Sequence, residues 1–109
     1  MAEEQQQKDM QLDKRISLTG FHDLDGVSLA SIKKTLENHV RKLTDLSTDF
    51  QGLRLVLKRV HHTDGSDLFD IKGRVNDKGK VFSAEHIDRN IVMTVNRVLE
   101  KLQQEMGRR

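Results

Sequence analysis

Apolar and polar residues alternate along four segments of this chain, and the alternation predicts four β-strands. The first is "ISLTGF", in which Ile16 and Leu18 alternate with Ser17 and Thr19. The other three are "LRLVLKRVHH", "LFDIKGRV" and "KVFSAEHI". Each has one apolar face, as expected of a strand that packs on a core by one side only. The polar faces of the second and third segments carry Arg54, Val56, Lys58, Asp70, Lys72 and Arg74.

Two longer segments repeat apolar residues at every third or fourth position, which predicts two amphipathic helices. The first runs from Ser28 to Leu46, and the second from about Asp88 to Met106. Ser28 and Asp88 are suitable N-cap residues. The two apolar stripes comprise Leu29, Ile32, Leu36, Val40, Leu43 and Leu46 in the first helix, and Ile91, Val92, Val95, Val98, Leu99, Leu102 and Met106 in the second.

The predicted order is β-α-β-β-β-α, which defines an α+β fold. Each helix has a single apolar stripe, so we expect both helices to pack on the same face of a four-stranded sheet. The other face would then be open to solvent, with Arg54, Lys58, Lys72 and Arg74 on it. The turn "NDKG" joins the third and fourth strands as a hairpin.

Composition adds limits on domain number and location. With 109 residues, of which 35% are hydrophobic, the chain suffices for one modest core. Residues 1–15 are polar and rich in glutamine, so we expect a disordered tail followed by a single domain over residues 16–109. We find neither an apolar run long enough to span a membrane nor a signal peptide, so we expect a cytoplasmic protein without a membrane partner. The absence of cysteine excludes disulfides and thiolate chemistry.

The segment "VHHTDGSD" is rich in histidine and aspartate, and it has two interpretations, a metal site or a turn. His61 and His62 are adjacent, so on an extended strand they would point to opposite faces and could not readily share an ion. Asp64 and Gly65 form a strong hairpin signal, because glycine accepts a positive φ and aspartate tolerates it. We therefore expect a turn between two strands, with no metal.

The remaining candidates for catalysis lack partners in the sequence. His39 lies near the apolar stripe of the first helix, which favours a packing role over general-base chemistry. His86 has no paired nucleophile in view, and no serine lies in a G-x-S-x-G motif. The glycines form neither a P-loop nor a dinucleotide fingerprint. We expect a protein that is not an enzyme and that takes no cofactor and no small-molecule substrate.

Basic residues on the polar faces of the helices are more informative. Arg97, Lys101 and Arg108 recur on one side of the second helix, and Lys34 and Arg41 stand two turns apart on the first. These residues fit an RNA-binding surface. They also fit ordinary solvated faces, on which Lys33, Glu37 and Arg41 form spaced ion pairs. The net charge of +2 does not decide between the two interpretations.

The order and spacing of several short segments favour the RNA-binding interpretation. "ISLTGF", "HVRKLTDL", "LRLVLKRVHHTDGSDLFDIKGRV", "VFSAEHID" and "VNRVLEKLQQEM" follow one another over residues 16–106. Together they resemble the bacterial family of ribosome hibernation-promoting factors and ribosome-associated translation inhibitors. The closest local matches are "SLTG", "RKL" with Arg41 and Lys42, "VLK" with Lys58, and "EKL" with Lys101. The chain departs from the family in having no tyrosine and in lacking the long C-terminal dimerisation extension of some members.

The resemblance implies a β-α-β-β-β-α fold like that of a double-stranded-RNA-binding domain, and a non-enzymatic protein that docks on small-subunit rRNA. Such a protein would occupy the path of messenger and transfer RNA and so inhibit or store idle ribosomes, as a monomer when off the ribosome. All four aromatic residues are phenylalanines, which disfavours a base-stacking RNA reader. The alternative is a protein–protein interaction module of the same fold without an RNA role. The candidate RNA-binding residues are Lys34, Arg41, Lys42, Lys58, Arg97, Lys101 and Arg108.

Overall fold

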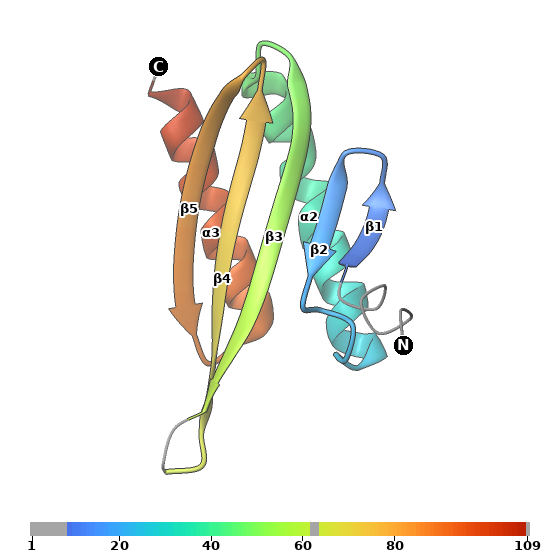
Figure 1. Ribbon diagram of the computed structural model, residues 1–109, viewed down its shortest axis with the longest axis vertical. Helices are drawn as coiled ribbons and strands as arrows, with labels where there is room; N and C mark the ends of the chain where they lie inside the picture. The colour runs from blue at the N-terminus through green and yellow to red at the C-terminus, as the bar shows by residue number, and fades with distance from the viewer. Residues whose placement is uncertain (1–8, 62–63, 109) are drawn as a thin grey trace.

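The predicted strands and helices are all present, in the predicted order. The computed structural model describes residues 9–61 and 64–108 (Figure 1). Its elements are β1 (Asp9–Asp13), β2 (Ile16–Thr19), α2 (Gly26–Leu46), β3 (Phe50–His61), β4 (Asp67–Asp77), β5 (Lys80–Asp88) and α3 (Ile91–Gly107). From β2 onward, this is the β-α-β-β-β-α order of an α+β fold.

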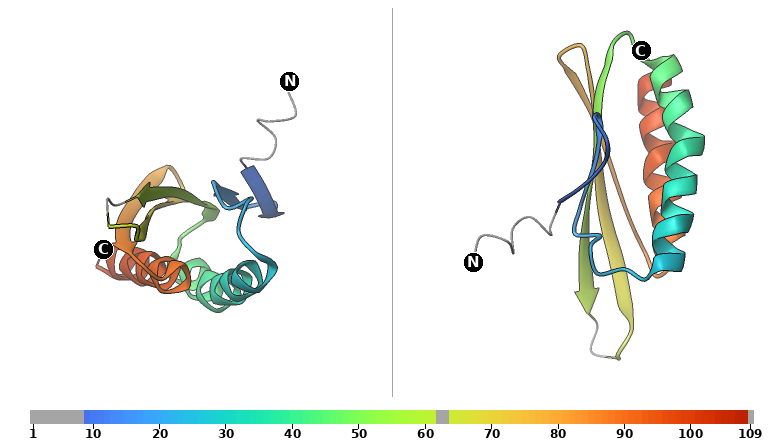
Figure 2. Two further views of the ribbon diagram at one scale, coloured as in Figure 1. Left: turned by 90° about the horizontal axis from the view of Figure 1, so that it is seen from below. Right: turned by 90° about the vertical axis from the view of Figure 1, so that its right-hand side faces the viewer.

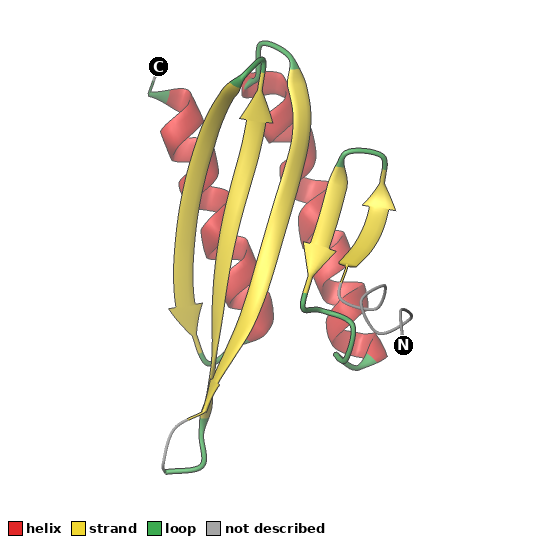
Figure 3. Ribbon diagram, in the orientation of Figure 1, coloured by secondary structure: helices red, strands yellow, loops and turns green. Residues whose placement is uncertain are grey.

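The strands form one mixed sheet in the spatial order β1-β2-β3-β4-β5. Strands β2 and β3 are parallel because α2 connects them as a crossover, whereas every other neighbouring pair is antiparallel. The register aligns Leu18 with Leu55, and Leu55 with Gly73. The inward-facing positions of neighbouring strands therefore lie side by side. β3 and β4 form a long hairpin that extends past the helices in Figure 3.

Strand β1 was not expected, because residues 1–15 were predicted to be a disordered tail. That expectation is wrong for residues 9–13, which pair with β2 and add a fifth strand to the predicted four. Pairing to the edge of a sheet uses backbone N–H and C=O groups, so it does not require a strong apolar alternation in the added strand. Residues 1–8 lie outside the described residues.

Deleting residues 1–15 is therefore expected to cost stability, by more than about 1 kcal/mol. The deletion removes β1 and the hydrogen bond of 2.8 Å in which the Leu53 N–H donates to the Arg15 carbonyl. It also removes the Arg15 guanidinium from above the Phe50 ring, 5.1 Å from its centroid. Urea unfolding of the two truncations that begin at residue 9 and at residue 16 measures this loss. Equal stability of the two truncations would contradict it.

Both helices pack on one face of the sheet, as predicted, and leave the other face open (Figure 2). The core between the two layers contains the inward strand positions and the apolar residues of both helix stripes except Leu46, which is 38% exposed at the end of α2. Gly73 lies on β4 directly beneath α3, where an added Cβ would come within 2.6 Å of Val98 Cγ1. A glycine at this position thus lets α3 approach the sheet closely. The largest fully buried side chains include Phe21, Leu18, Ile32, Leu36, Leu43, Leu99 and Leu102.

The helix N-caps differ from those predicted. Helix α2 is capped by Asp25, whose carboxylate accepts the Ser28 N–H at 2.9 Å, so Ser28 lies within the first turn. The hydrogen bonds from Ser28 hold the pKa of Asp25 below its usual value. Helix α3 is capped by Asn90, which accepts the Met93 N–H at 2.9 Å, and Asp88 remains in β5. Several adjacent residues could cap each helix, and only the direction of the incoming chain selects one.

Residues 64–66, the described part of the segment between β3 and β4, form a turn, as predicted. Gly65 has a φ of +89°, and the Asp64 carboxylate accepts both the N–H and the hydroxyl of Ser66. Those two hydrogen bonds lower the pKa of Asp64. Across the hairpin, His61 Nδ1 lies 2.7 Å from Asp67 Oδ1. His62 lies outside the described residues, and among those described no three His, Asp or Glu side chains converge on a metal position.

Candidate nucleic-acid interface

The basic residues predicted on α3 are exposed, but each has a contact on the protein. Arg97 lies 3.4 Å from Glu100, and Arg108 lies 3.2 Å from Glu105, in each case one turn along the helix. The Arg97 and Arg108 side chains are 57% and 72% exposed. Exposed ion pairs of this kind contribute little to stability, so phosphate groups can replace the carboxylates at low cost.

Lys101 reaches from α3 to the edge of the sheet. Its ammonium donates to the backbone carbonyl of Glu85 at 2.8 Å and lies 3.3 Å from His86 Nδ1. His86 in turn lies 3.7 Å from the Asp88 carboxylate. Lys101 thus links α3 to β5, and its charge remains on the surface at the side of the helix layer.

Helix α2 presents its basic residues more openly. Lys34, Arg41 and Lys42 are exposed, and none of them forms an ion pair within residues 9–61 and 64–108. The ion pairs expected among Lys33, Glu37 and Arg41 are likewise not formed in this part of the chain. These side chains instead border a groove of about 550 Å³ between α2 and β2. The groove is lined by Ile16, Lys33, Leu36, Glu37, Val40, Arg41, Thr44 and Asp45.

His39 joins the two helices and so holds their outer faces in a set arrangement. Its Nδ1 contacts Gln103 Oε1, and its Nε2 lies 2.8 Å from Asn96 Oδ1, both on α3. The Asn96 amide nitrogen donates onward to Glu100 at 3.2 Å. His39 was expected to have a packing role, and the structure shows that this role depends on hydrogen bonds between the helices.

Lys58 does not join the helix residues. It lies on β3, exposed on the open face of the sheet and directly across from Asp70 on β4. The seven predicted site residues therefore divide between two surfaces, with six on the helix layer and Lys58 on the opposite side.

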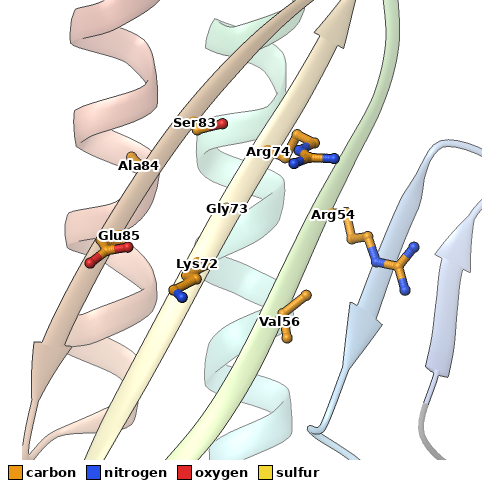
Figure 4. A pocket seen from close by; sticks show the side chains of 8 residues that line it. All are labelled: Arg54, Val56, Lys72, Gly73, Arg74, Ser83, Ala84 and Glu85. Atoms are coloured by element: carbon orange, nitrogen blue, oxygen red, sulfur yellow. The ribbon is translucent and has the colours of Figure 1, made fainter.

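The open face of the sheet carries a second concentration of basic residues (Figure 4). A hollow of about 560 Å³ is lined by Arg54, Val56, Lys72, Gly73, Arg74, Ser83, Ala84 and Glu85. A second hollow, of about 310 Å³, shares Arg54 and Arg74 with the first. It adds Lys14 and Arg15, which were expected to lie in a disordered tail. No pattern in the sequence indicated that these two residues would line a hollow together with the sheet arginines.

The fold and its surfaces define a class of protein: a small α+β domain with a β-α-β-β-β-α core and basic residues on both its helix layer and its open sheet. No helix among the described residues combines the length and apolar character needed to cross a membrane. Neither the protein-family models nor the curated protein sequences include a match to this chain.

Among solved structures, the chain is similar to the N-terminal domain of Protein Y from Thermus thermophilus. The two share 16% sequence identity, with a TM-score of 0.53 over 91% of this chain and 98% of that domain. The similarity therefore covers nearly all of both chains and establishes the shared fold. It confirms the β-α-β-β-β-α architecture that the resemblance in the sequence implied.

Proposed function

We propose that this protein binds the small ribosomal subunit and keeps ribosomes idle without performing bond chemistry. The observation that carries the proposal is the fold match to the Protein Y N-terminal domain over almost the whole of both chains. It agrees with the independent resemblance of the sequence segments to the ribosome hibernation family. Fold alone does not define a function, so the proposal also needs a surface suited to the partner.

The helix layer supplies that surface. Lys34, Arg41 and Lys42 are exposed on α2, and Arg97 and Arg108 are exposed on α3. Lysine and arginine side chains bind RNA by neutralising phosphates and displacing counterions, which requires charge and shape but no catalytic group. In this mechanism the helix layer lies against rRNA, and the body of the domain blocks the path of messenger and transfer RNA. The protein would act in the cytoplasm, as a monomer when off the ribosome.

Reversing charge on both helices is expected to abolish association with ribosomes. The test variant combines Arg41→Glu with Arg97→Glu, because both side chains are exposed. The control variant combines Lys78→Glu with Lys80→Glu, which changes the net charge equally at the β4–β5 turn. Co-sedimentation with small subunits at several salt concentrations gives the readout. Each lost phosphate contact should lower the slope of log affinity against log salt by roughly one unit.

Two outcomes would count against the proposal. If the helix variant sediments with small subunits as the wild-type protein does, the helix layer is not the rRNA-binding surface. If the wild-type protein binds a partner with an affinity that salt does not change, the contact is apolar, and the protein-interaction alternative is favoured.

A further inference from the structure

We propose that the open face of the sheet is a separate RNA-binding site, which takes the phosphodiester backbone of a single-stranded segment. Its centre is the pair Arg54 and Arg74, with Lys72 beside them. This surface lies on the opposite side of the sheet from the helix residues of the proposed function, and it can be tested without ribosomes.

The strand register builds the site. Ser17 on β2 is aligned with Arg54 on β3, Arg54 with Arg74 on β4, and Arg74 with Ser83 on β5. One row across the sheet thus places two arginines side by side between two hydroxyl residues. The backbones of such neighbours are about 5 Å apart, which is within the span of one phosphate group bound by two guanidinium groups. Lys72 lies two positions further along β4, on the same face.

Two arginines directly across a pair of strands repel each other, so their like charges do not by themselves stabilise the sheet. Arg54 donates to the Thr19 hydroxyl at 3.4 Å, which orients its side chain toward β2. Lys72 and Arg74 form no ion pair in the part of the chain that the structure describes. These two side chains are therefore available to a ligand.

The shape of the surface favours an extended polyanion over a single small anion. The two hollows share Arg54 and Arg74 in their linings, so they lie next to each other on the sheet, and we call the two together the track. Among the described residues that line the two hollows, Glu85 supplies the one carboxylate, at the β5 end. The basic residues along the track are Lys14, Arg15, Arg54, Lys72 and Arg74.

The floor of the track indicates how a single-stranded RNA segment would be bound. Val56 is apolar, and it lines the hollow together with Gly73 and Ala84, whose Cβ positions face the helices, so that their backbone offers a flat surface to sugars. The described lining of the two hollows contains no aromatic side chain, so it offers bases no platform on which to stack. Recognition would rest on phosphates and would be independent of base sequence.

Fluorescence anisotropy with a labelled, unstructured uridine oligonucleotide tests the site at low salt. Arg74→Glu and Lys72→Glu should each weaken binding by about tenfold or more, since each removes a charge-assisted contact to phosphate. The control Lys80→Glu makes the same charge change on β5 away from the track, and it should leave affinity within about twofold. Glu85→Gln removes the carboxylate at the β5 end of the track and should strengthen binding.

Further variants distinguish binding at the sheet from binding at the helix layer and from attraction to net charge alone. The helix variant Arg41→Glu with Arg97→Glu should keep its affinity for the oligonucleotide, even if the ribosome proposal fails. Circular dichroism checks that each variant is folded. The inference is overturned if Lys80→Glu weakens binding as much as Arg74→Glu, or if only the helix variant loses binding. It is also overturned if a polyglutamate peptide binds the wild-type protein as tightly as the RNA, because the face would then suit acidic proteins.

Discussion

Replacing Gly20 with alanine is expected to destabilise the protein by about 3 kcal/mol, a large share of the total stability of a small domain. Gly20 follows β2 with a φ of +87°, a conformation that costs any other residue roughly 1–2 kcal/mol. An added Cβ would also lie 2.4 Å from the backbone carbonyl oxygen of Leu57. That oxygen belongs to the neighbouring strand β3 and cannot move aside as a flexible side chain can.

Gly79 provides a matched control for this substitution. It has a φ of +86°, but a Cβ added there would meet no atom within 4 Å. Gly79→Ala should therefore lower the free energy of unfolding only by the contribution of the positive φ, about 1 kcal/mol. Urea unfolding of the two variants separates the steric part from the conformational part. A Gly20→Ala variant no less stable than Gly79→Ala would show that the contact with Leu57 is not tight.

Replacing Asp77 with alanine is expected to lower the free energy of unfolding by about 2–4 kcal/mol. Asp77 is 1% exposed, and its carboxylate accepts the Thr48 N–H at 3.1 Å and the Asp49 N–H at 2.7 Å. In the same place the Lys78 N–H donates to the Asp49 carbonyl at 3.2 Å. These bonds tie the loop after α2 to the β4–β5 turn. Without the carboxylate, two partly buried N–H groups lose their acceptor.

Asp77→Asn tests which property of the side chain matters. Asparagine keeps the shape but offers one acceptor oxygen in place of two, so it should recover part of the loss. Thermal or urea unfolding of both variants gives the comparison. If Asp77→Ala is within about 0.5 kcal/mol of the wild-type protein, the loop is held by other contacts.

The sequence by itself determined the order of the elements and the direction in which their side chains face. A period of two in "LRLVLKRV" requires that Leu53, Leu55 and Leu57 share a face, and the structure buries all three. The stripe from Ile91 to Met106 likewise requires a helix with one buried side. These features could be predicted because burial of apolar residues at a fixed period is a local property of the chain.

Only the tertiary structure decided which distant residues meet. Strand β1 forms because β2 offers a free edge, and the weak local pattern of residues 9–13 does not reveal that edge. The row from Ser17 to Ser83 depends on the register of four strands, which no single segment contains. The separation of Lys58 from Arg41 follows from the layer of the fold to which each belongs. Surface charges cost little wherever they lie, so periodicity predicts that they are exposed but not which of them share a surface.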